Sequence, residues 1–360
     1  MSVPLESSCY RFRNGKLNPD SEDDVRLLLR GEGIKRLESF VFELLMQRAL
    51  EHYCGHMPIA YGWYVLPLDG IEAALWIRME TESPLGRCDD VLLGLLRDRG
   101  SSILKVRLSP HGVGFTGSWY VEGAWEKEQD LDVLLRDRFG ARGAVSQPKP
   151  ASADRAEEVF DALLPRMREA ERRTLALSRL LINCFIAPYT RSQPMDLDAV
   201  VLNDEGRLKF VEFKRKYPAG NMTFGVDVQP HAALIRWLHI SGHRLSNVVL
   251  ADPCWNKDIS PLHLLEGPAK QYVRWVGAHL DPTCFEKKKL ATTGADSGMF
   301  HFDRSQEAVR VGHYVDLGQS FAPSRLGAFL NDDETLPFTS ARSLKQAKDE
   351  ASAAEACPKK

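Results

Sequence analysis

The sequence lacks any apolar run long enough to cross a bilayer, any strong net charge and any Cys-x-x-Cys pair. A membrane-spanning helix needs about 20 consecutive apolar residues, so we expect no membrane contact. Lys and Arg number 47 against 49 Asp and Glu, which gives a net charge of −2. This balance excludes a globally basic nucleic-acid coat, and any contact with a polyanion requires a local basic patch or a metal ion.

Cysteines are few and scattered, with 7 in 360 residues. Their odd number and the length of the chain disfavour a disulfide scaffold, so the pattern predicts free thiols in a reducing compartment. The beginning of the chain carries charged side chains and no apolar run, unlike a signal peptide. We therefore expect a cytoplasmic protein.

The composition is that of an ordinary globular protein, with 44% hydrophobic and 27% charged residues. At roughly 150 residues per domain, the length predicts about two domains. The segment GARGAVSQPKPASADRA combines Gly, Pro, Ser and Ala without apolar periodicity, as a linker does. We place an α+β domain for recognition or partner binding at 1–146, the linker at 147–153, a second domain at 154–338 and a disordered tail at 339–360.

Apolar spacing in the first domain predicts secondary structure but no catalytic motif. We expect a hairpin turning at Asp69 and Gly70. Helices are predicted at 23–29, 34–53 and 131–138, and further strands at 102–108 and 113–121.

The second domain has a predicted element order of α-β-β-β-α-β. Its first helix spans 155–179 and is broken near Pro165. Strands are expected at 180–187, 196–203, 207–216 and 248–251, with a helix at 227–241 before the last of them.

The stretch PMDLDAVVLNDEGRLKFVEFKRK, which covers 194–216, carries the chemistry. Its two strands flank a short turn in which Gly206 supplies the left-handed conformation, and this turn pairs Asn203 with Arg207. Counting outwards from the turn, Asp198 lies directly opposite Glu212. Opposed residues share one face of a sheet, with Cβ atoms about 5 Å apart. Lys214 is two residues beyond Glu212 and therefore projects from that face as well.

The neighbours of these three residues are almost all apolar, which is typical of strands buried on both faces. Two buried carboxylates cost several kcal/mol (on the order of 3–5) unless something compensates their charge. A divalent cation such as Mg²⁺, which prefers hard oxygen ligands, provides that compensation. Lys214 can orient or deprotonate an attacking water, or neutralise charge on a phosphate. The competing interpretation is a structural Glu–Lys pair beside a surface Asp.

The pattern resembles the PD-(D/E)XK nuclease superfamily, which has the restriction-endonuclease-like fold, over about 155–253. Asp198 matches the family acid on the second core strand, and Glu212, Phe213 and Lys214 match the E-x-K triplet on the third. The resemblance implies an α/β core and phosphodiester hydrolysis with Mg²⁺ or Mn²⁺. Asp198, Glu212 and the Phe213 carbonyl would bind the metal, and Lys214 would lie beside the attacking water. Leu197 stands where the motif name has Pro.

Further site residues are expected from the same resemblance. Asp196 shares the face of Asp198 and is an extra or alternative ligand. A Glu from the first helix often completes the site, and Glu171 is our candidate, with Glu169, Glu158 and Glu157 as competitors. Gln229 fits a polar position on the helix after the triplet.

Arg215 and Lys216 directly follow the triplet and are candidates for phosphate contacts. The resemblance to this family implies DNA rather than RNA as substrate and a role in defence or mobile-element biology. It also allows a homodimer or larger complex. The alternative function is an inactive nuclease-fold module that binds nucleic acid or protein.

Overall fold

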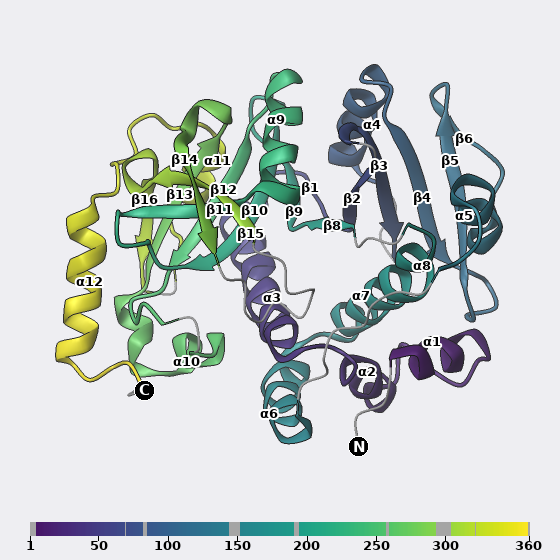
Figure 1. The fold of residues 1–360 in the computed structure, drawn as a ribbon, viewed down its shortest axis with the longest axis horizontal. Helices are drawn as coiled ribbons and strands as arrows, with labels where there is room; N and C mark the ends of the chain where they lie inside the picture. Colours follow the sequence, from purple (N-terminus) through teal and green to yellow (C-terminus); the bar gives the residue numbers. More distant parts are fainter. Residues whose placement is uncertain are drawn as a thin grey trace. The chain divides into compact units, whose positions relative to one another are not determined.

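The structure, a computed structural model, describes residues 5–68, 70–81, 85–143, 152–190, 194–256, 259–292, 304–320 and 322–358. The described chain divides into two compact units, of mixed α and β structure (Figure 1). Unit 1 comprises residues up to Phe40 together with Gly62–Leu197, and unit 2 comprises Val41–Tyr61 and the described residues from Asp198 onward.

This division corrects the predicted domain boundaries. The chain passes from unit 1 to unit 2 after Leu197, not within 147–153, and the second half of helix α3 (Ile34–Cys54) belongs to unit 2. Of the expected linker, 147–151 lie outside the described residues, and Ala153 already begins helix α6 (Ala153–Leu163). The composition of the Gly- and Pro-containing segment indicated a break in regular structure, but tertiary contacts set the limits of each unit.

Unit 1 contains a mixed sheet with strand order β6-β5-β4-β3-β2-β8, and β7 pairs with β5. Strands β3 and β4 are parallel with α4 between them in the chain, and the other neighbours are antiparallel. The predicted hairpin forms, with Leu68 paired to Gly70, while Asp69 lies outside the described residues. The strands are β2 (Trp63–Leu68), β3 (Gly70–Glu80), β4 (Ser102–Leu108), β5 (Phe115–Val121), β6 (Ala124–Trp125), β7 (Gln129–Asp130) and β8 (Met195–Leu197).

The helices of unit 1 agree with the predicted spacing at three places. Helices α2 (Glu22–Leu29), α3 and α5 (Leu131–Phe139) begin and end within one residue of the expected ranges. In α2, the Ser21 hydroxyl caps the first turn by accepting from Asp24 N at 3.4 Å, which satisfies one free amide of the helix start. The other helices are α1 (Leu5–Arg13), α4 (Arg87–Asp98), α6, α7 (Glu169–Leu180) and α8 (Ala187–Thr190).

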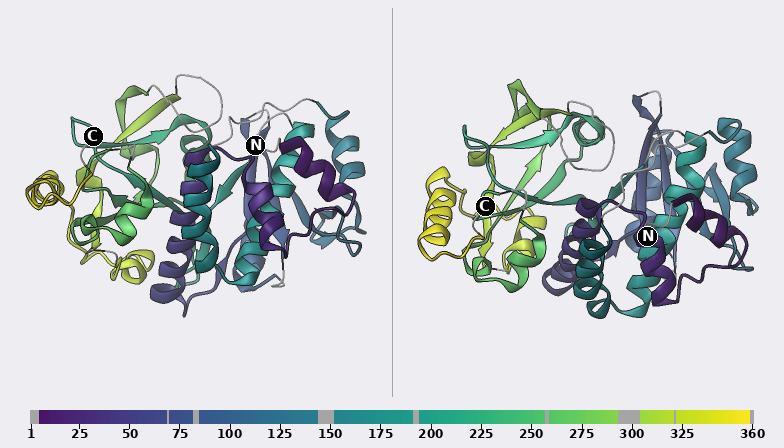
Figure 2. Two further views of the ribbon diagram at one scale, coloured as in Figure 1. Left: turned by 90° about the horizontal axis from the view of Figure 1, so that it is seen from below. Right: turned by 60° about the horizontal axis from the view of Figure 1, so that its bottom comes forward.

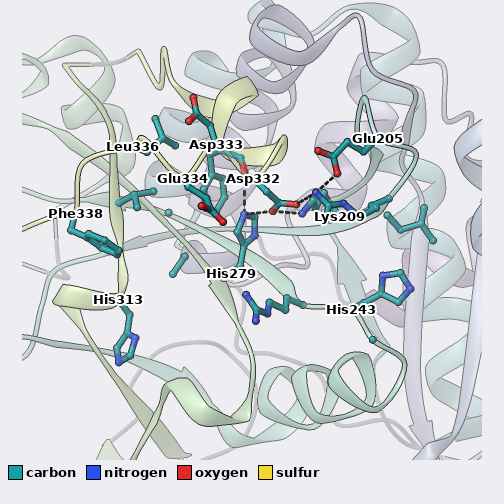
Figure 3. A pocket seen from close by; sticks show the side chains of 18 residues that line it. Glu205, Lys209, His243, His279, His313, Asp332, Asp333, Glu334, Leu336 and Phe338 are labelled. Atoms are coloured by element: carbon teal, nitrogen blue, oxygen red, sulfur yellow. Dashed lines mark hydrogen bonds and ion pairs between the residues drawn. The ribbon is translucent and has the colours of Figure 1, made fainter.

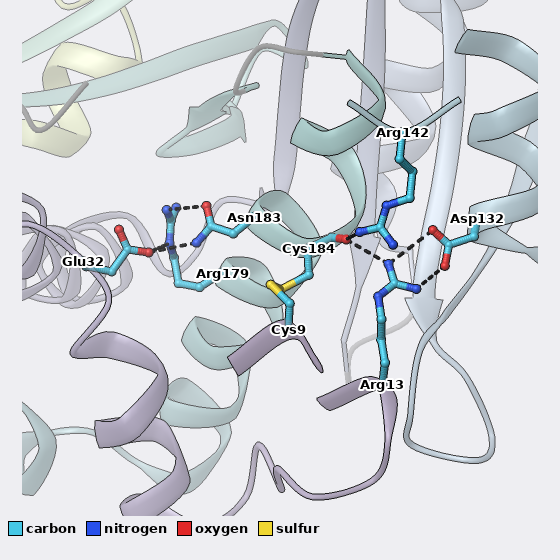
Figure 4. The surroundings of a disulfide bond; sticks show 8 residues. All are labelled: Cys9, Arg13, Glu32, Asp132, Arg142, Arg179, Asn183 and Cys184. Carbon is cyan, nitrogen blue, oxygen red and sulfur yellow. Dashed lines mark hydrogen bonds and ion pairs between the residues drawn. A yellow bond between two sulfur atoms is a disulfide. The ribbon is translucent and has the colours of Figure 1, made fainter. Parts of the chain in front are cut away.

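The predicted strand at 180–187 is wrong. Leu181–Ile186 is a π-helical turn that joins α7 to α8 in one helical stretch. A short apolar run fits a buried helix as well as a buried strand, and here all six residues are buried. The helical spacing also lets Arg179 and Asn183 both contact the buried carboxylate of Glu32, at 2.8 and 2.9 Å (Figure 4).

The same helical stretch carries a disulfide between Cys184 and Cys9 of α1, with Cα atoms 5.4 Å apart (Figure 4). Arg13 and Arg142 both donate to the Cys184 carbonyl oxygen at 2.8 Å. A second disulfide joins Cys254 to Cys357. The prediction of free thiols is therefore wrong for four of the cysteines, because the fold brings together residues 175 and 103 positions apart.

Unit 2 is built on a six-stranded sheet with order β1-β9-β10-β12-β13-β16. Strands β10 and β12 are parallel, and every other neighbouring pair is antiparallel. A smaller sheet has the order β11-β15-β14. The strands are β1 (Ile59–Ala60), β9 (Ala199–Leu202), β10 (Leu208–Lys216), β11 (Thr223–Asp227), β12 (Leu245–Ala251), β13 (Arg274–Leu280), β14 (Phe285–Thr292), β15 (Arg304–Arg310) and β16 (Val315–Gln319).

The two faces of the six-stranded sheet bury different partners. Val211 and Phe213 belong to an apolar cluster with Phe42 and Met46 of α3. Because side chains alternate along a strand, Glu212 projects from the opposite face, toward the π-helical turn η3 (Val228–Ala232) that leads into helix α9 (Ala233–Ile240). The predicted helix at 227–241 therefore exists, but its first turn is wider than an α-helix.

The predicted disordered tail is also wrong. Residues Ala341–Ala353 form helix α12, drawn in yellow at the edge of unit 2 in Figures 1 and 2. Ser340 caps it by accepting from Ser343 N at 3.0 Å, its small apolar face is buried at Ala347 and Ala351, and Cys357 ties its end to Cys254. The remaining helices of unit 2 are α10 (Pro261–Glu266) and α11 (Leu326–Leu330). No helix within the described ranges is both long and apolar enough to cross a membrane.

Candidate functional site

The hairpin of β9 and β10 forms with the predicted register. Asn203 N donates to the Arg207 carbonyl at 3.0 Å, and Gly206 between them has φ of 74°. The ladder continues to Val211, which pairs with Ala199. One step further places Asp198 opposite Glu212, as the sequence predicted, although Asp198 itself sits in the bend before β9.

The side chain of Asp198 reaches across to the neighbouring strand. Its Oδ2 accepts a hydrogen bond from Phe213 N at 2.6 Å, and the residue is half-buried. Phe213 N lies between Glu212 and Lys214 in the chain, so this bond holds the Asp198 carboxylate against the E-x-K triplet. The structure therefore brings the three principal residues of the prediction into one place.

Glu212 is the most buried charged group of the site, with 2% of the residue exposed. Its Oε1 forms an ion pair with Lys214 and lies 2.8 Å from His231 Nε2. Burial raises the pKa of Glu212, but the positive charges of Lys214 and His231 outweigh it, so the net pKa is below its usual value. Glu212 is therefore ionised at neutral pH inside an apolar sheet.

The second oxygen of this carboxylate has no hydrogen-bond partner among the described residues. Glu212 Oε2 is buried and unsatisfied, and an unpaired buried oxygen on a charged group costs about 1–3 kcal/mol or more. Such groups point to an unfilled role, for example as a ligand for an ion.

A divalent cation suits the kinds of oxygen donor present at this site. Glu212 Oε2, the Asp198 carboxylate and the Phe213 carbonyl are hard oxygen donors, and Mg²⁺ usually binds one or two carboxylates with water and phosphate completing its shell. A full protein cage is not present, since no group of three or more His, Cys, Asp or Glu residues within the described part of the chain is arranged to bind a metal. Any ion here would therefore depend on water or substrate oxygens.

Lys214 differs from Glu212 in its access to solvent. Its side chain is 33% exposed, against 3% for Glu212. Lys214 therefore contacts the buried carboxylate and is also accessible to a ligand that approaches from solvent.

Sequence reasoning missed two residues that touch this site. His231, in the π-helical turn, contacts Glu212, whereas the side chain of the predicted Gln229 lies outside the described residues. Asn247 of β12 pairs with Glu212 in register and is buried, and its Oδ1 accepts from the Tyr314 hydroxyl at 3.0 Å. Only the parallel pairing of β10 with β12 could have identified Asn247, because the two residues are far apart in sequence.

The remaining predicted acids are placed elsewhere. Glu171 is in unit 1, where its carboxylate accepts from Arg168 N at 2.6 Å and pairs with the Arg168 guanidinium, so it caps helix α7. Asp196 is also in unit 1, on β8, and binds Arg36 at 3.0 Å. Glu157 binds Arg26 and Arg30 in the same unit.

The two predicted phosphate contacts already have main-chain partners. Arg215 Nη1 donates to the Ile259 carbonyl at 2.6 Å, and the Lys216 ammonium donates to the Gly225 carbonyl. Arg215 therefore holds a neighbouring loop and Lys216 contacts strand β11, and a phosphate would compete with those carbonyls.

A second polar cluster of unit 2 lies in a pocket of about 870 Å³ (Figure 3). Asp332 pairs there with Lys209, and its Oδ1 lies 3.2 Å from His279 Nε2. Burial lowers the pKa of His279 to about 4, so its imidazole is neutral at neutral pH. The side chain of Lys209 projects from the face opposite Glu212, and Glu212, Asp198 and Lys214 are not among the residues that line this pocket.

Comparison with known protein families, with curated proteins and with solved structures finds no match to this chain.

Proposed function

We propose that this protein is a metal-dependent nuclease that hydrolyses phosphodiester bonds with Mg²⁺ or Mn²⁺, with DNA favoured over RNA. The observation that carries the proposal is the buried carboxylate of Glu212, opposite Asp198 and two residues from Lys214, with one oxygen that no described residue pairs with. An arrangement that serves stability alone would pair both oxygens or replace the acid by an apolar residue.

The order of elements in unit 2 supports a restriction-endonuclease-like core. Among the strands of the six-stranded sheet and the helices beside them in the chain, α3, β1, β9, β10, α9 and β12 follow the order α-β-β-β-α-β. Strands β10 and β12 are parallel, and β1, β9 and β10 are antiparallel; β11, which belongs to the smaller sheet, comes between β10 and α9. The first helix and strand come from the beginning of the chain, so the segment Gly62–Leu197 is inserted between the first two core strands. This arrangement differs from the prediction, which took both elements from 155–187.

The first helix of the proposed core is thus α3 and not α7. A carboxylate contributed by the first helix would have to come from α3, which removes Glu171 as a family-type ligand. The resemblance in the E-x-K hairpin does not depend on that residue.

The residues of the site have separable roles in this proposal. Asp198, Glu212 through Oε2, and the Phe213 carbonyl would hold the ion, and His231 holds Glu212 Oε1 in place. The bound metal would supply charge neutralisation for the phosphate and activation of a water. Lys214 lies at the solvent side of the site and there orients the attacking water or neutralises charge that develops on the phosphate.

Incubation with plasmid, linear duplex, single-stranded DNA and RNA in Mg²⁺, Mn²⁺ or EDTA tests this function. Cleavage should require metal and should be lost in Asp198→Ala, Glu212→Gln and Lys214→Ala, while matched substitutions on the exposed side of α12, Lys345→Ala and Asp349→Asn, keep it. Undiminished cleavage by the Asp198 and Glu212 variants would assign the activity to another site or protein. Binding of a nucleic acid with no cleavage in any metal would favour the alternative, an inactive binding module.

A further inference from the structure

The segment after β12 holds a tryptophan in an unusual backbone conformation. Trp255 has φ of 47°, a left-handed value that is rare for a bulky residue and costs about 1–3 kcal/mol. It is kept there by its neighbours: Asp252 Oδ1 accepts from Cys254 N at 2.8 Å, and Cys254 is bonded to Cys357. Such strain persists where the surrounding structure enforces it, often at a binding site.

This tryptophan lies at the same end of the sheet as the proposed catalytic residues. Asp252 N donates to the Lys216 carbonyl at 2.9 Å, so the alignment of β10 with β12 extends to the start of the Trp255 turn. Tyr217 is the residue directly after β10 and comes three residues after Lys214, a span of about 10 Å along an extended strand. Because side chains alternate, Tyr217 continues the face of Phe213 and not that of Glu212 and Lys214, so a bound strand would pass around the end of the sheet to reach both.

The rings of Tyr217 and Trp255 are nearly parallel, with an interplanar angle of 15° and centroids 6.4 Å apart. Both residues are only half-buried, whereas Trp63, Trp76 and Trp275 are at most 1% exposed. The pair is therefore not part of the apolar core and presents aromatic surface to solvent.

One positive charge lies against the aromatic pair. The Lys348 ammonium lies over the Trp255 ring, 4.6 Å from its centroid. A cation beside stacked aromatic rings suits a ligand that combines a flat π-surface with negative charge.

We propose that Tyr217 and Trp255 form a stacking platform for unpaired nucleobases, with Lys348 contacting the adjacent phosphate. The proposal deepens the nuclease function and rests on it in one respect, namely that the bound strand is the substrate. Bases within a duplex are already stacked on each other and are not available to the rings. The enzyme would therefore prefer single strands, flaps or frayed ends.

The test is binding of the full-length protein to labelled oligonucleotides in EDTA, which separates binding from cleavage. Fluorescence anisotropy compares a 20-residue single strand of DNA, the same strand of RNA, the duplex and a strand of equal length with abasic sites. Trp255→Leu and Tyr217→Leu remove one π-face each and keep apolar volume. Each should weaken binding of single strands by about 5- to 100-fold, and Trp255→Phe should restore most of it.

The abasic strand provides the sharpest control. Wild type should bind it at least as weakly as either Leu variant binds the normal strand, and each Leu variant should distinguish the two strands less than wild type does. Phe338→Ala, which removes another aromatic residue that is 73% exposed, should leave affinity unchanged. Thermal unfolding of each variant identifies a loss of fold. If Trp255→Leu does not fold, Tyr217→Leu and the abasic strand still test whether the rings bind bases.

Equal binding of normal and abasic strands by wild type would overturn the platform, as would preference for duplex or displacement by a neutral oligosaccharide. Loss of base-dependent binding with metal-dependent cleavage intact would overturn the platform and leave the nuclease standing. Base-dependent binding without cleavage would support the platform and refute the catalytic function.

Discussion

Replacing Lys214 by alanine tests whether the buried charge of Glu212 depends on its partner. The Glu212 side chain is 3% exposed, and its Oε1 contacts only Lys214 and His231 among the side chains for which a contact is described. Removing one partner of a buried pair costs about 3–5 kcal/mol. His231 remains and Lys214 is one-third exposed, so we expect a loss of about 2–3 kcal/mol in the free energy of unfolding.

The assay is urea or thermal unfolding at pH 7 with two companion variants. For a unit of roughly 150 to 250 residues, each kcal/mol lowers Tm by about 2–4 °C. In a Glu212→Gln background the charge is gone, so Lys214→Ala should cost less than about 0.5 kcal/mol. Lys345→Ala, on the exposed side of α12, is the matched control.

Metal ions should reverse part of this loss if Glu212 binds them. Without the competing ammonium, Mg²⁺ should raise Tm more in Lys214→Ala than in wild type, and not in the double variant. An equal cost of Lys214→Ala in both Glu212 backgrounds would refute the reasoning, because the two side chains would then act independently.

Other features of the structure make separate predictions. Asp89→Asn should cost about 3 kcal/mol, because the buried pair of Arg78 and Asp89 is broken; a loss below about 1 kcal/mol in urea unfolding would argue against the pair. The pKa of His279 is lowered to about 4 from 6.5, so the unfolded chain binds a proton first, and stability should fall as pH decreases from 6.5 to 4. His279→Phe should flatten that slope, and an unchanged slope would assign it to other groups. A thiol assay on denatured, unreduced protein should detect three free thiols, because Cys9 is bonded to Cys184 and Cys254 to Cys357. Detection of seven thiols would contradict both disulfides.

Local signals in the sequence were sufficient for the central hairpin. Gly206 determines the turn, alternation determines which side chains share a face, and the apolar neighbours indicate burial. Asp198, Glu212 and Lys214 are brought together in the structure because they depend only on contacts within one short hairpin.

Features that depend on distant contacts could not be predicted in the same way. Strand β1 has two residues and no pattern of its own, and it becomes a strand only by pairing with β9 across an inserted unit. The run at 180–187 is apolar enough for a strand, but its burial against Glu32 and Cys9 stabilises a helix. The π-helical turn before α9 places His231 against Glu212, a contact that the spacing of an ordinary α-helix does not indicate.

The sequence by itself determined the hairpin, its turn and the grouping of two acids with one lysine, since short-range geometry encodes all of these. Only the tertiary structure decided how the units are assembled from separate segments, which cysteines are bonded, and that one oxygen of Glu212 is buried without a hydrogen-bond partner in the described part of the chain. The disulfides and the pairing of β1 with β9 join segments more than a hundred residues apart, and the burial of Glu212 depends on β12 and the turn before α9; no local pattern specifies which other segment will cover a given strand.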